Sequence, residues 1–462
     1  MDLGEVHPVR WSRPGDPHDE TAVPGTYSVN DEGRVEAHLH ATWDGSASFG
    51  FSAGPELPPL LHGESFGEHI NLVGPRLGRS KGGMRSLGDI TLHADYALEG
   101  FAFLSEHELA FTDLRLRFTD QDEWTGWDRF AVSHQIGSLT DVSASLRPVD
   151  ELAAEVDGGV LRLVDASRVV YDPIKRRWEL ATRSMFELHL DEPLPIGAIF
   201  DRYAYPLQVA LLSASGRLPG VASMAGTNTT WDFASGNTRV TPRWFQVRLF
   251  HGPLDTAHIS NLTFLHRLGD LDFPTHLPRL LRVVEVHRFA LSHYALLHAE
   301  HAAGGHLARF GVAVQMIEAF DRTLHPLDTG TVSLEARLKR LEHETGGLID
   351  LVIGNRRWRG EVAQLRNFAL HGDIHAVDVL RDQRPLVAAS EALLMLFETR
   401  FLVEIGIQPD QAQKLVTGRV HHWTIVQAIT SNYPALTAML ETERLRHGRK
   451  KGSGVNRTAA SR

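Results

Sequence analysis

The chain has 462 residues, no cysteine and a formal net charge of −10, with 42% hydrophobic and 23% charged residues. This is the composition of a soluble globular protein of two or three domains, and it excludes disulfides and thiolate metal sites. The first residues lack the basic start and apolar run of a signal peptide, and no apolar stretch reaches membrane-spanning length. We therefore expect a cytoplasmic protein without a membrane partner.

The two parts of the chain differ in charge. Residues 1–275 hold 23 Lys and Arg against 38 Asp and Glu, whereas residues 276–462 hold the remaining 24 Lys and Arg against 19 Asp and Glu. A basic excess favours polyanions, so a site for such a ligand is expected in the C-terminal part. An ordinary solvated surface is the alternative interpretation of so small an excess.

Residues 1–275 are predicted to be rich in β-structure. Apolar and polar residues alternate with the period of two that is typical of half-buried strands. The runs are Val35–Trp43, Leu114–Phe118, Phe186–Leu190 and Phe245–Leu249. Short strands separated by Gly and Pro turn signals indicate sandwich-like or barrel-like units, with one helix near residues 207–215. We expect a first domain at 1–150 and a second β-rich subdomain at 151–275.

The period changes to 3.6 after residue 275, which predicts an all-α bundle over residues 276–448. The predicted helices are Pro278–Ala302, Leu307–Thr323, Ser333–Thr345, Glu361–Leu370, Leu386–Ile405 and Gln411–Ile429. Residues 449–462 are predicted to be a disordered basic tail. The fold class is therefore α+β multidomain, with a β-rich N-terminal region followed by a helical bundle.

The stretch Leu365–Asp373 combines groups suited to phosphodiester chemistry. Arg366 offers a planar fork of donors that stays charged, which suits a phosphate. His371 is able to move a proton near neutral pH, and Asn367 lies between them in sequence. The alternative is an arginine on a solvated helix face and a histidine that ends the helix before Gly372.

The order Arg, Asn, three residues, His resembles the active-site motif of HEPN ribonucleases, small helical domains that cleave RNA without a metal and usually act as dimers. Residues 309–322 resemble the early helix of ApeA-type HEPN domains, with Glu318 at the acidic position. Residues 60–64, 90–92, 98–100 and 111–127 resemble the N-terminal domain of ApeA-type proteins, in which a β-rich domain precedes a HEPN domain.

This resemblance implies a metal-independent endoribonuclease of anti-phage abortive infection, with tRNA among the conceivable RNA substrates. His371 would transfer protons, Arg366 would bind the scissile phosphate, and Asn367 would orient the histidine or donate to a phosphate oxygen. Glu318 would set the orientation of the arginine or histidine. It implies no cofactor and no metal, and a phage-derived trigger as a partner.

Helix geometry complicates this assignment. Residues five apart in an α-helix point about 140° away from each other, so Arg366 and His371 do not share a face of a regular helix. Either Gly372 lets the last turn unwind, or the site is shared across a two-fold axis. The apolar residues around most of Leu386–Ile405 also favour burial by a second copy. We therefore expect a homodimer, or a higher oligomer, formed through the helical domain.

Two other functions remain open from the sequence. One is a HEPN module that binds RNA or a nucleotide without cutting it, with the β-rich region recognising a partner. The other is a metal-dependent hydrolase built on clustered histidines, since His298 and His301 lie three residues apart on a predicted helix. The cluster comprises His287, His293, His298, His301 and His306.

Overall fold

The computed structural model forms two compact units, Met1–Gln208 with Pro219–His258 and Val209–Leu218 with Ile259–Arg462. Helix α3 (Tyr205–Ser215) is divided between them. The structure describes residues 4–12, 22–30, 33–40, 57–81, 89–100, 103, 105, 109–134, 142–173, 177–228, 234–235, 238–239, 244–249, 264–298, 305–326, 332–370, 381–418 and 422–452.

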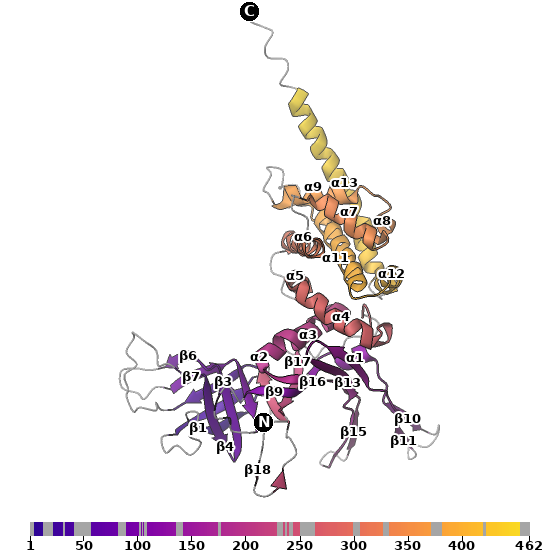
Figure 1. Ribbon diagram of the computed structural model, residues 1–462. Helices are drawn as coiled ribbons and strands as arrows, with labels where there is room; N and C mark the ends of the chain where they lie inside the picture. The colour runs from indigo at the N-terminus through magenta and orange to yellow at the C-terminus, as the bar shows by residue number, and fades with distance from the viewer. Residues whose placement is uncertain are drawn as a thin grey trace, which may run out of the picture. The chain divides into compact units, whose positions relative to one another are not determined.

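The first unit is built on one antiparallel sheet (Figure 1). Fourteen strands of the described residues form it, in the order β12-β13-β16-β9-β17-β20-β8-β5-β4-β1-β2-β3-β7-β6. The strands are β1 (Val6–Ser12), β2 (Val23–Val29), β3 (Val35–Leu39), β4 (Leu60–Ser65), β5 (Glu68–Val73), β6 (Arg76–Lys81), β7 (Asp89–Ala94), β8 (Tyr96–Glu99), β9 (Ala110–Phe118), β12 (Leu152–Val156), β13 (Gly159–Asp165), β16 (Ser184–Pro195), β17 (Val221–Thr227) and β20 (Phe245–Leu249).

The alternation in the sequence places one side of each strand in the core. In β3 the side chains of Val35, Ala37 and Leu39 are buried, whereas Glu36 and His38 are partly exposed. The aromatic rings of Trp11 and Tyr27 join this core with their centroids 6.5 Å apart. The predicted strands at 114–118, 186–190 and 245–249 are confirmed as parts of β9, β16 and β20.

The sheet curls strongly between β2 and β8. Three strands separate β2 from β8 in the sheet order, yet Tyr27 Oη of β2 donates to Glu99 Oε1 of β8 at 3.0 Å. Arg248 of β20 contacts the same carboxylate at 3.3 Å. A flat sheet would hold these strands far apart, because neighbouring strands are separated by nearly 5 Å. This part of the sheet therefore closes around its core like a half-barrel.

Shorter elements complete the first unit. Helix α1 (Gln121–Thr125) buries Trp124 against Phe186, and α2 (Ile196–Ile199) and η2 (Phe200–Ala204) lead into α3. In the described parts of this unit, three two-stranded ribbons lie outside the large sheet. They are β10 (Phe130–His134) with β11 (Val142–Leu146), β14 (Arg168–Asp172) with β15 (Arg177–Ala181), and β18 (Ala234–Ser235) with β19 (Thr238–Arg239).

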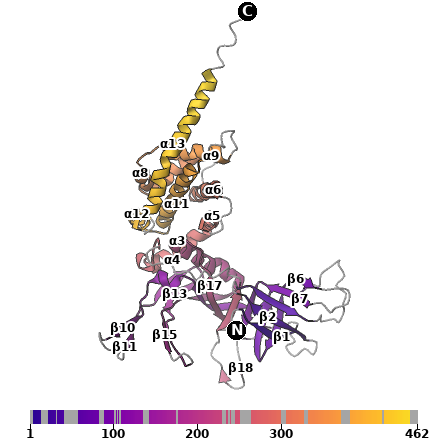
Figure 2. The same ribbon diagram turned by 180° about the vertical axis from the view of Figure 1, so that it is seen from behind.

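The second unit is helical (Figure 2). Apart from the α3 segment, its described elements are η3 (Leu268–Asp270), α4 (Phe273–Val286), α5 (Arg288–His298), α6 (Gly305–Leu324), α7 (Leu334–Glu344), α8 (Leu348–Ile353), α9 (Trp358–Leu370), α11 (Arg384–Glu404), α12 (Pro409–Gly418) and α13 (His422–Gly452). The fold class expected from the sequence, a β-rich N-terminal region followed by a helical region, is confirmed.

Most of the predicted helices are present, with three differences in extent. The prediction of a single helix over 278–302 is wrong, because α4 ends before His287 and a separate helix, α5, begins after it. Helix α8 was not predicted. The last predicted helix, 411–429, is replaced by α12 and α13, and α13 continues through Pro434 to Gly452. It thereby includes the start of the predicted basic tail, whose residues 453–462 lie outside the described residues.

Helix α11 is the central helix of the second unit. It packs against α6, α12 and α13, and nearly all its side chains are buried, including Glu398 and Arg400. Its apolar circumference is therefore covered within the chain, and the argument from this helix to a second copy is wrong. Among the described helices, none combines the length and the apolar character that crossing a membrane requires.

The predicted domain boundaries remain predictions. Strand β9, before residue 150, pairs with β16, after it, so one sheet spans the predicted boundary between the first domain and the second subdomain. The change from sheet to helices falls between β20 and η3 in the described residues.

The β4–β5 hairpin contains a strained residue. Phe66 and Gly67 form its two-residue turn with φ of 48° and 81°, and the Phe66 side chain is 90% exposed. Two positive φ angles define a turn that favours Asn-Gly, and a bulky residue in the left-handed region is strained. We expect Phe66→Asn to stabilise the first unit by about 1 kcal/mol, because it relieves strain without losing buried area.

Urea unfolding monitored by tryptophan fluorescence measures this effect. The matched change Gly67→Ala puts a side chain at the other positive φ and should lower the unfolding midpoint. A lower midpoint for Phe66→Asn would show that the ring stabilises the hairpin.

Candidate active site on helix α9

Helix α9 is anchored by its buried face. Trp358, Val362 and Leu365 recur at helical spacing and are fully or almost fully buried, which fixes the rotation of the helix. Glu361 is also buried, and its Oε2 accepts hydrogen bonds from the hydroxyls of Tyr433 and, at 3.3 Å, Thr437 on α13. Burial and the Glu361 carboxylate raise the pKa of Tyr433, so this hydroxyl stays protonated as a donor.

This anchoring leaves Arg366 near the surface and directed to α6. Its Nη2 lies 3.4 Å from Glu318 Oε1, and the side chains of Arg366 and Glu318 are 30% and 17% exposed. Glu318 is the acidic residue expected from the resemblance, 48 positions earlier in the chain. Arg322, one turn further along α6, also contacts Glu318 at 3.5 Å and is 66% exposed.

The geometry of this contact permits phosphate binding. Charge-assisted hydrogen bonds between arginine and carboxylate are usually 2.7–2.9 Å long, so the contact at 3.4 Å is weak. A weak pair at a partly exposed site orients the guanidinium at little energetic cost. An anion that approaches from solvent would compete with Glu318 for the same fork of donors.

The other residues of the motif lie at the C-terminal end of α9. Asn367 is exposed, and its Oδ1 accepts a hydrogen bond from Arg366 Nη1 at 3.3 Å. Its amide nitrogen therefore presents a donor beside the arginine. His371 and Gly372 lie outside the described residues. The structure thus brings together Arg366, Asn367 and Glu318, and it leaves the assignment of His371 a prediction.

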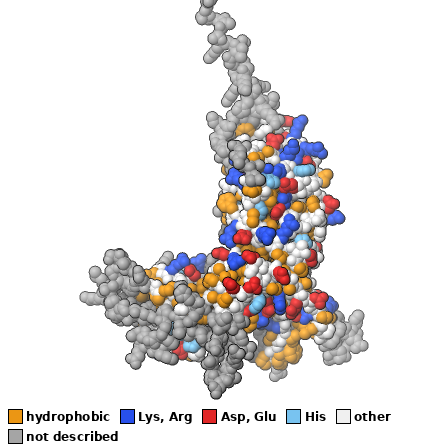
Figure 3. All heavy atoms as spheres, viewed as in Figure 1, with side chains coloured by type: hydrophobic (Ala, Val, Ile, Leu, Met, Phe, Trp, Pro, Cys, Tyr) orange, Lys and Arg blue, Asp and Glu red, His pale blue; other side chains and the backbone are white. Residues whose placement is uncertain are grey.

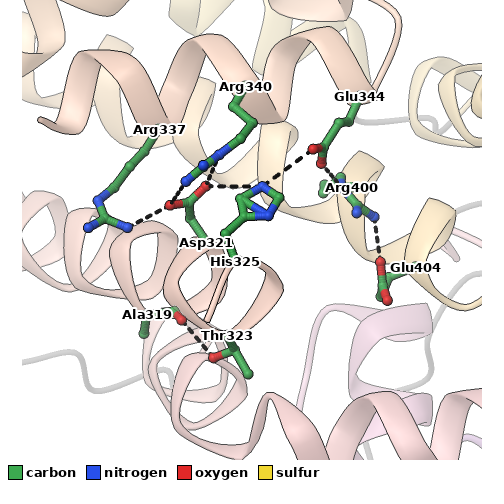
Figure 4. Close-up of polar contacts among 9 residues, drawn as sticks. All are labelled: Ala319, Asp321, Thr323, His325, Arg337, Arg340, Glu344, Arg400 and Glu404. Carbon is green, nitrogen blue, oxygen red and sulfur yellow. Dashed lines mark hydrogen bonds and ion pairs between the residues drawn. The ribbon is translucent and has the colours of Figure 1, made fainter. Parts of the chain in front are cut away.

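Three residues after Glu318 on the same helix, Asp321 is the centre of an ionic network that joins α6 to α7 (Figure 4). Asp321 is fully buried, and it accepts from Arg337 Nη1 at 2.5 Å and from Arg340 Nη2 at 2.7 Å. His325 lies 3.8 Å from the same carboxylate and 3.4 Å from Glu344. The network continues through Arg400 of α11, which contacts Glu344 and Glu404 at 2.8 Å each.

A second group of carboxylates lies between α7 and α9. Asp350 of α8 accepts from Trp358 Nε1 at 2.9 Å and contacts Arg359 at 3.3 Å. Glu342 of α7 is 1% exposed, and its Oε1 accepts from the Asp350 backbone N at 2.8 Å. Burial raises the pKa of Glu342 from 4.5 to about 7. No sequence pattern marked these pairs, because each joins residues that only packing brings together.

The clustered histidines have other partners. His287 is 2% exposed and its ring lies 4.4 Å from that of Phe320; burial lowers its pKa to about 4, so it is neutral at physiological pH. His293 contacts Gln315, and the His298 ring packs on Tyr294. Within the described residues, no group of three or more His, Asp or Glu side chains is arranged to hold a metal ion. His301 lies outside those residues.

Comparison with known proteins identifies part of the chain. The family model described as ApeA N-terminal domain 1 matches residues 9–154. This segment is therefore similar to the ApeA N-terminal domain, and the resemblance to ApeA-type proteins is confirmed over it. The match does not extend into the helical unit. The searches of curated proteins and of solved structures each gave no match.

The pKa of Glu342 predicts a pH dependence of stability. A pKa of about 7 in the folded state, above the ordinary 4.5, means that folding favours the protonated form. The contribution of Glu342 to the free energy of unfolding is fully present below pH 4.5 and is lost as the pH rises through 7. Glu342→Gln should therefore stabilise the helical unit by about 3 kcal/mol at pH 8 and have little effect at pH 4.5.

Urea unfolding at the two pH values tests this, with Glu335→Gln as control because Glu335 is exposed on the same helix. An equal effect of Glu342→Gln at both pH values would mean that folding does not shift the pKa of Glu342, and it would contradict this prediction.

Proposed function

We propose that the chain is a metal-independent endoribonuclease of the HEPN type that acts in anti-phage defence by abortive infection. The ApeA N-terminal domain at residues 9–154 supports a role in anti-phage defence. The observation that carries the nuclease assignment is the contact between Arg366 of the motif and Glu318 of α6. Two residues singled out by resemblance, far apart in sequence, lie together at a partly exposed surface.

The proposed reaction uses the 2′-hydroxyl of the RNA as nucleophile. His371 accepts the 2′-hydroxyl proton while the 2′-oxygen attacks the adjacent phosphorus, and the bond to the 5′-oxygen breaks. Arg366 and the Asn367 amide donate to the phosphate oxygens, where negative charge grows in the transition state. Glu318 holds the Arg366 fork in position. The leaving 5′-oxygen takes a proton from solvent water, and His371 then releases its proton to solvent, so the products are a 2′,3′-cyclic phosphate and a 5′-hydroxyl.

Cleavage assays on total cellular RNA, with end-labelling of the products, test this function. We expect Arg366→Ala and His371→Ala each to abolish cleavage with little change in thermal stability, and Glu318→Gln to reduce it. The control is Arg282→Ala, which removes an exposed arginine of α4 that lies outside the motif, and it should retain most of the activity. RNA ends with a 5′-phosphate would contradict the mechanism, because they indicate an activated water instead.

Binding without turnover by the unmodified protein would support the alternative of a HEPN module that only binds RNA or a nucleotide. Whether the helical unit cleaves RNA or only binds it, we propose that the ApeA-like N-terminal domain contacts a phage-derived trigger.

We further propose that the active form is a homodimer, or a higher oligomer of dimers, formed through the helical unit. Phe289 and Leu296 lie seven residues apart, hence on one face of α5, and are 68% and 55% exposed. His293 lies between them and contacts Gln315, one turn before Glu318 on α6. This apolar line therefore borders the site, and we propose that the second copy packs against it.

Light scattering of the Phe289→Glu/Leu296→Glu variant tests the interface. We expect a dimer for the unmodified chain, and a monomer without nuclease activity for the variant, because two buried charges oppose association. Leu351→Glu is the control, since Leu351 of α8 is 74% exposed and apolar but lies outside this line. An unmodified monomer that stays active at high dilution would contradict the proposal.

A further inference from the structure

Arginines gather along α9 beyond the motif itself. Arg356 and Arg357 precede the helix, Arg359 lies in its first turn and Arg366 near its end. Arg322 of α6 is the fifth arginine of this region, and four of the five contact one of two carboxylates, Glu318 and Asp350. Figure 3 shows Lys and Arg side chains gathered on the upper part of the helical unit in that view. The region therefore carries a net positive charge in a chain that is acidic overall.

The arginines at the start of α9 differ in exposure, and the two most exposed are accessible to a ligand. Arg356 is 89% exposed, with Nε 3.9 Å from Asp350 Oδ2, and Arg357 is exposed as well. Arg359 is 14% exposed and lies 3.3 Å from the same carboxylate. Asp350 thus neutralises one of these charges at most. The positive charge of Arg356 and Arg357 remains accessible from solvent.

Helical spacing places Arg359 on the same side of α9 as Arg366. Arg359 and Arg366 are seven residues apart, so they lie on nearly the same side of α9 and about 10 Å apart along its axis. Between them the partly exposed positions of the helix are Gly360, Ala363 and Gln364, and Glu335 of α7 lies beside Gly360. A ligand backbone is thus able to approach the helix at Ala363, whose side chain is small.

The neighbouring helix contributes no net charge there. On α7, the carboxylate of Glu335 approaches Gly360, and Lys339 follows it one turn later. Glu361 points the other way, because it is buried against α13. An anion that runs along the exposed side of α9 therefore meets more positive than negative charge at both ends of its path.

We propose that single-stranded RNA crosses α9 along this side, with the scissile phosphate at Arg366 and a phosphate several nucleotides away on Arg356 and Arg357. This inference rests on the proposed nuclease function and adds to it a second, non-catalytic contact with the substrate. Arginine pairs with phosphate through several donors at once, which favours a nucleic acid over a ligand with isolated charges. The contact reads the RNA backbone and not its bases.

The test is binding of a single-stranded RNA oligonucleotide that carries 2′-O-methyl groups throughout, so that no 2′-hydroxyl is available for cleavage. Fluorescence anisotropy gives Kd for the full-length protein over a range of salt concentrations. We expect Arg356→Ala/Arg357→Ala to raise Kd on the order of ten-fold at low salt. The slope of log Kd against the logarithm of the salt concentration should also decrease by about 1.4. Each lost phosphate contact lowers this slope by about 0.7 for a single strand.

The matched control is Arg282→Ala/Lys414→Ala, which removes two exposed cations from α4 and α12 of the same unit. It should leave Kd and the salt dependence nearly unchanged. The same Kd and slope for both double variants would overturn the proposed path, and so would the absence of oligonucleotide binding by the unmodified protein. Equal affinity for a polyglutamate peptide of the same charge would also overturn it, in favour of an acidic protein partner.

The outcome is separable from that of the proposed function. If unmodified protein cleaves ordinary RNA while the Arg356→Ala/Arg357→Ala variant binds like the control, the path is wrong and the nuclease assignment stands. If the oligonucleotide binds through Arg356 and Arg357 but ordinary RNA is not cleaved, the path stands and the catalytic assignment is wrong.

Discussion

The arrangement of the helical unit depends on the buried carboxylate of Asp321. It pairs with both Arg337 and Arg340 at the interface of α6 and α7, and its own side chain is fully buried. Removing one partner from such a buried pair typically destabilises a protein by about 3–5 kcal/mol, because the remaining charges stay buried without compensation. Asp321 follows Glu318 by three residues on the same helix. The register that the network imposes on α6 therefore also determines where Glu318 meets Arg366.

Local sequence rules predicted the helices that obey them. Ser333 accepts from the Ala336 backbone N as an N-cap, and α7 begins at the next residue, as its sequence indicated. The rules failed where tertiary packing overrides them. Pro434 does not end α13, whose neighbours on α9 and α11 hold the helix together across it. The break at His287 carries neither Gly nor Pro, so no local signal marked it.

The candidate site was predictable only in part. Arg366 and Asn367 are neighbours in sequence, so their proximity required no fold, whereas the position of Glu318 came from resemblance to a family and its contact from packing. No sequence pattern marked Asp350, Glu342 or Tyr433, since their contacts form only when α7, α8, α9 and α13 pack together. The apolar sequence of α11 was interpreted as an interface, but the same composition describes a central helix surrounded by its own chain.

Helix α13 has a mechanical consequence for the site. It is 31 residues long, about 45 Å, and its first half packs on α8, α9, α11 and α12. Tyr433 and Thr437 of that half both donate to Glu361, five residues before Arg366. The two hydrogen bonds to Glu361 therefore couple the position of α13 directly to the helix that carries Arg366. A ligand or partner that displaced the C-terminal half of α13 would act on α9 through these two contacts.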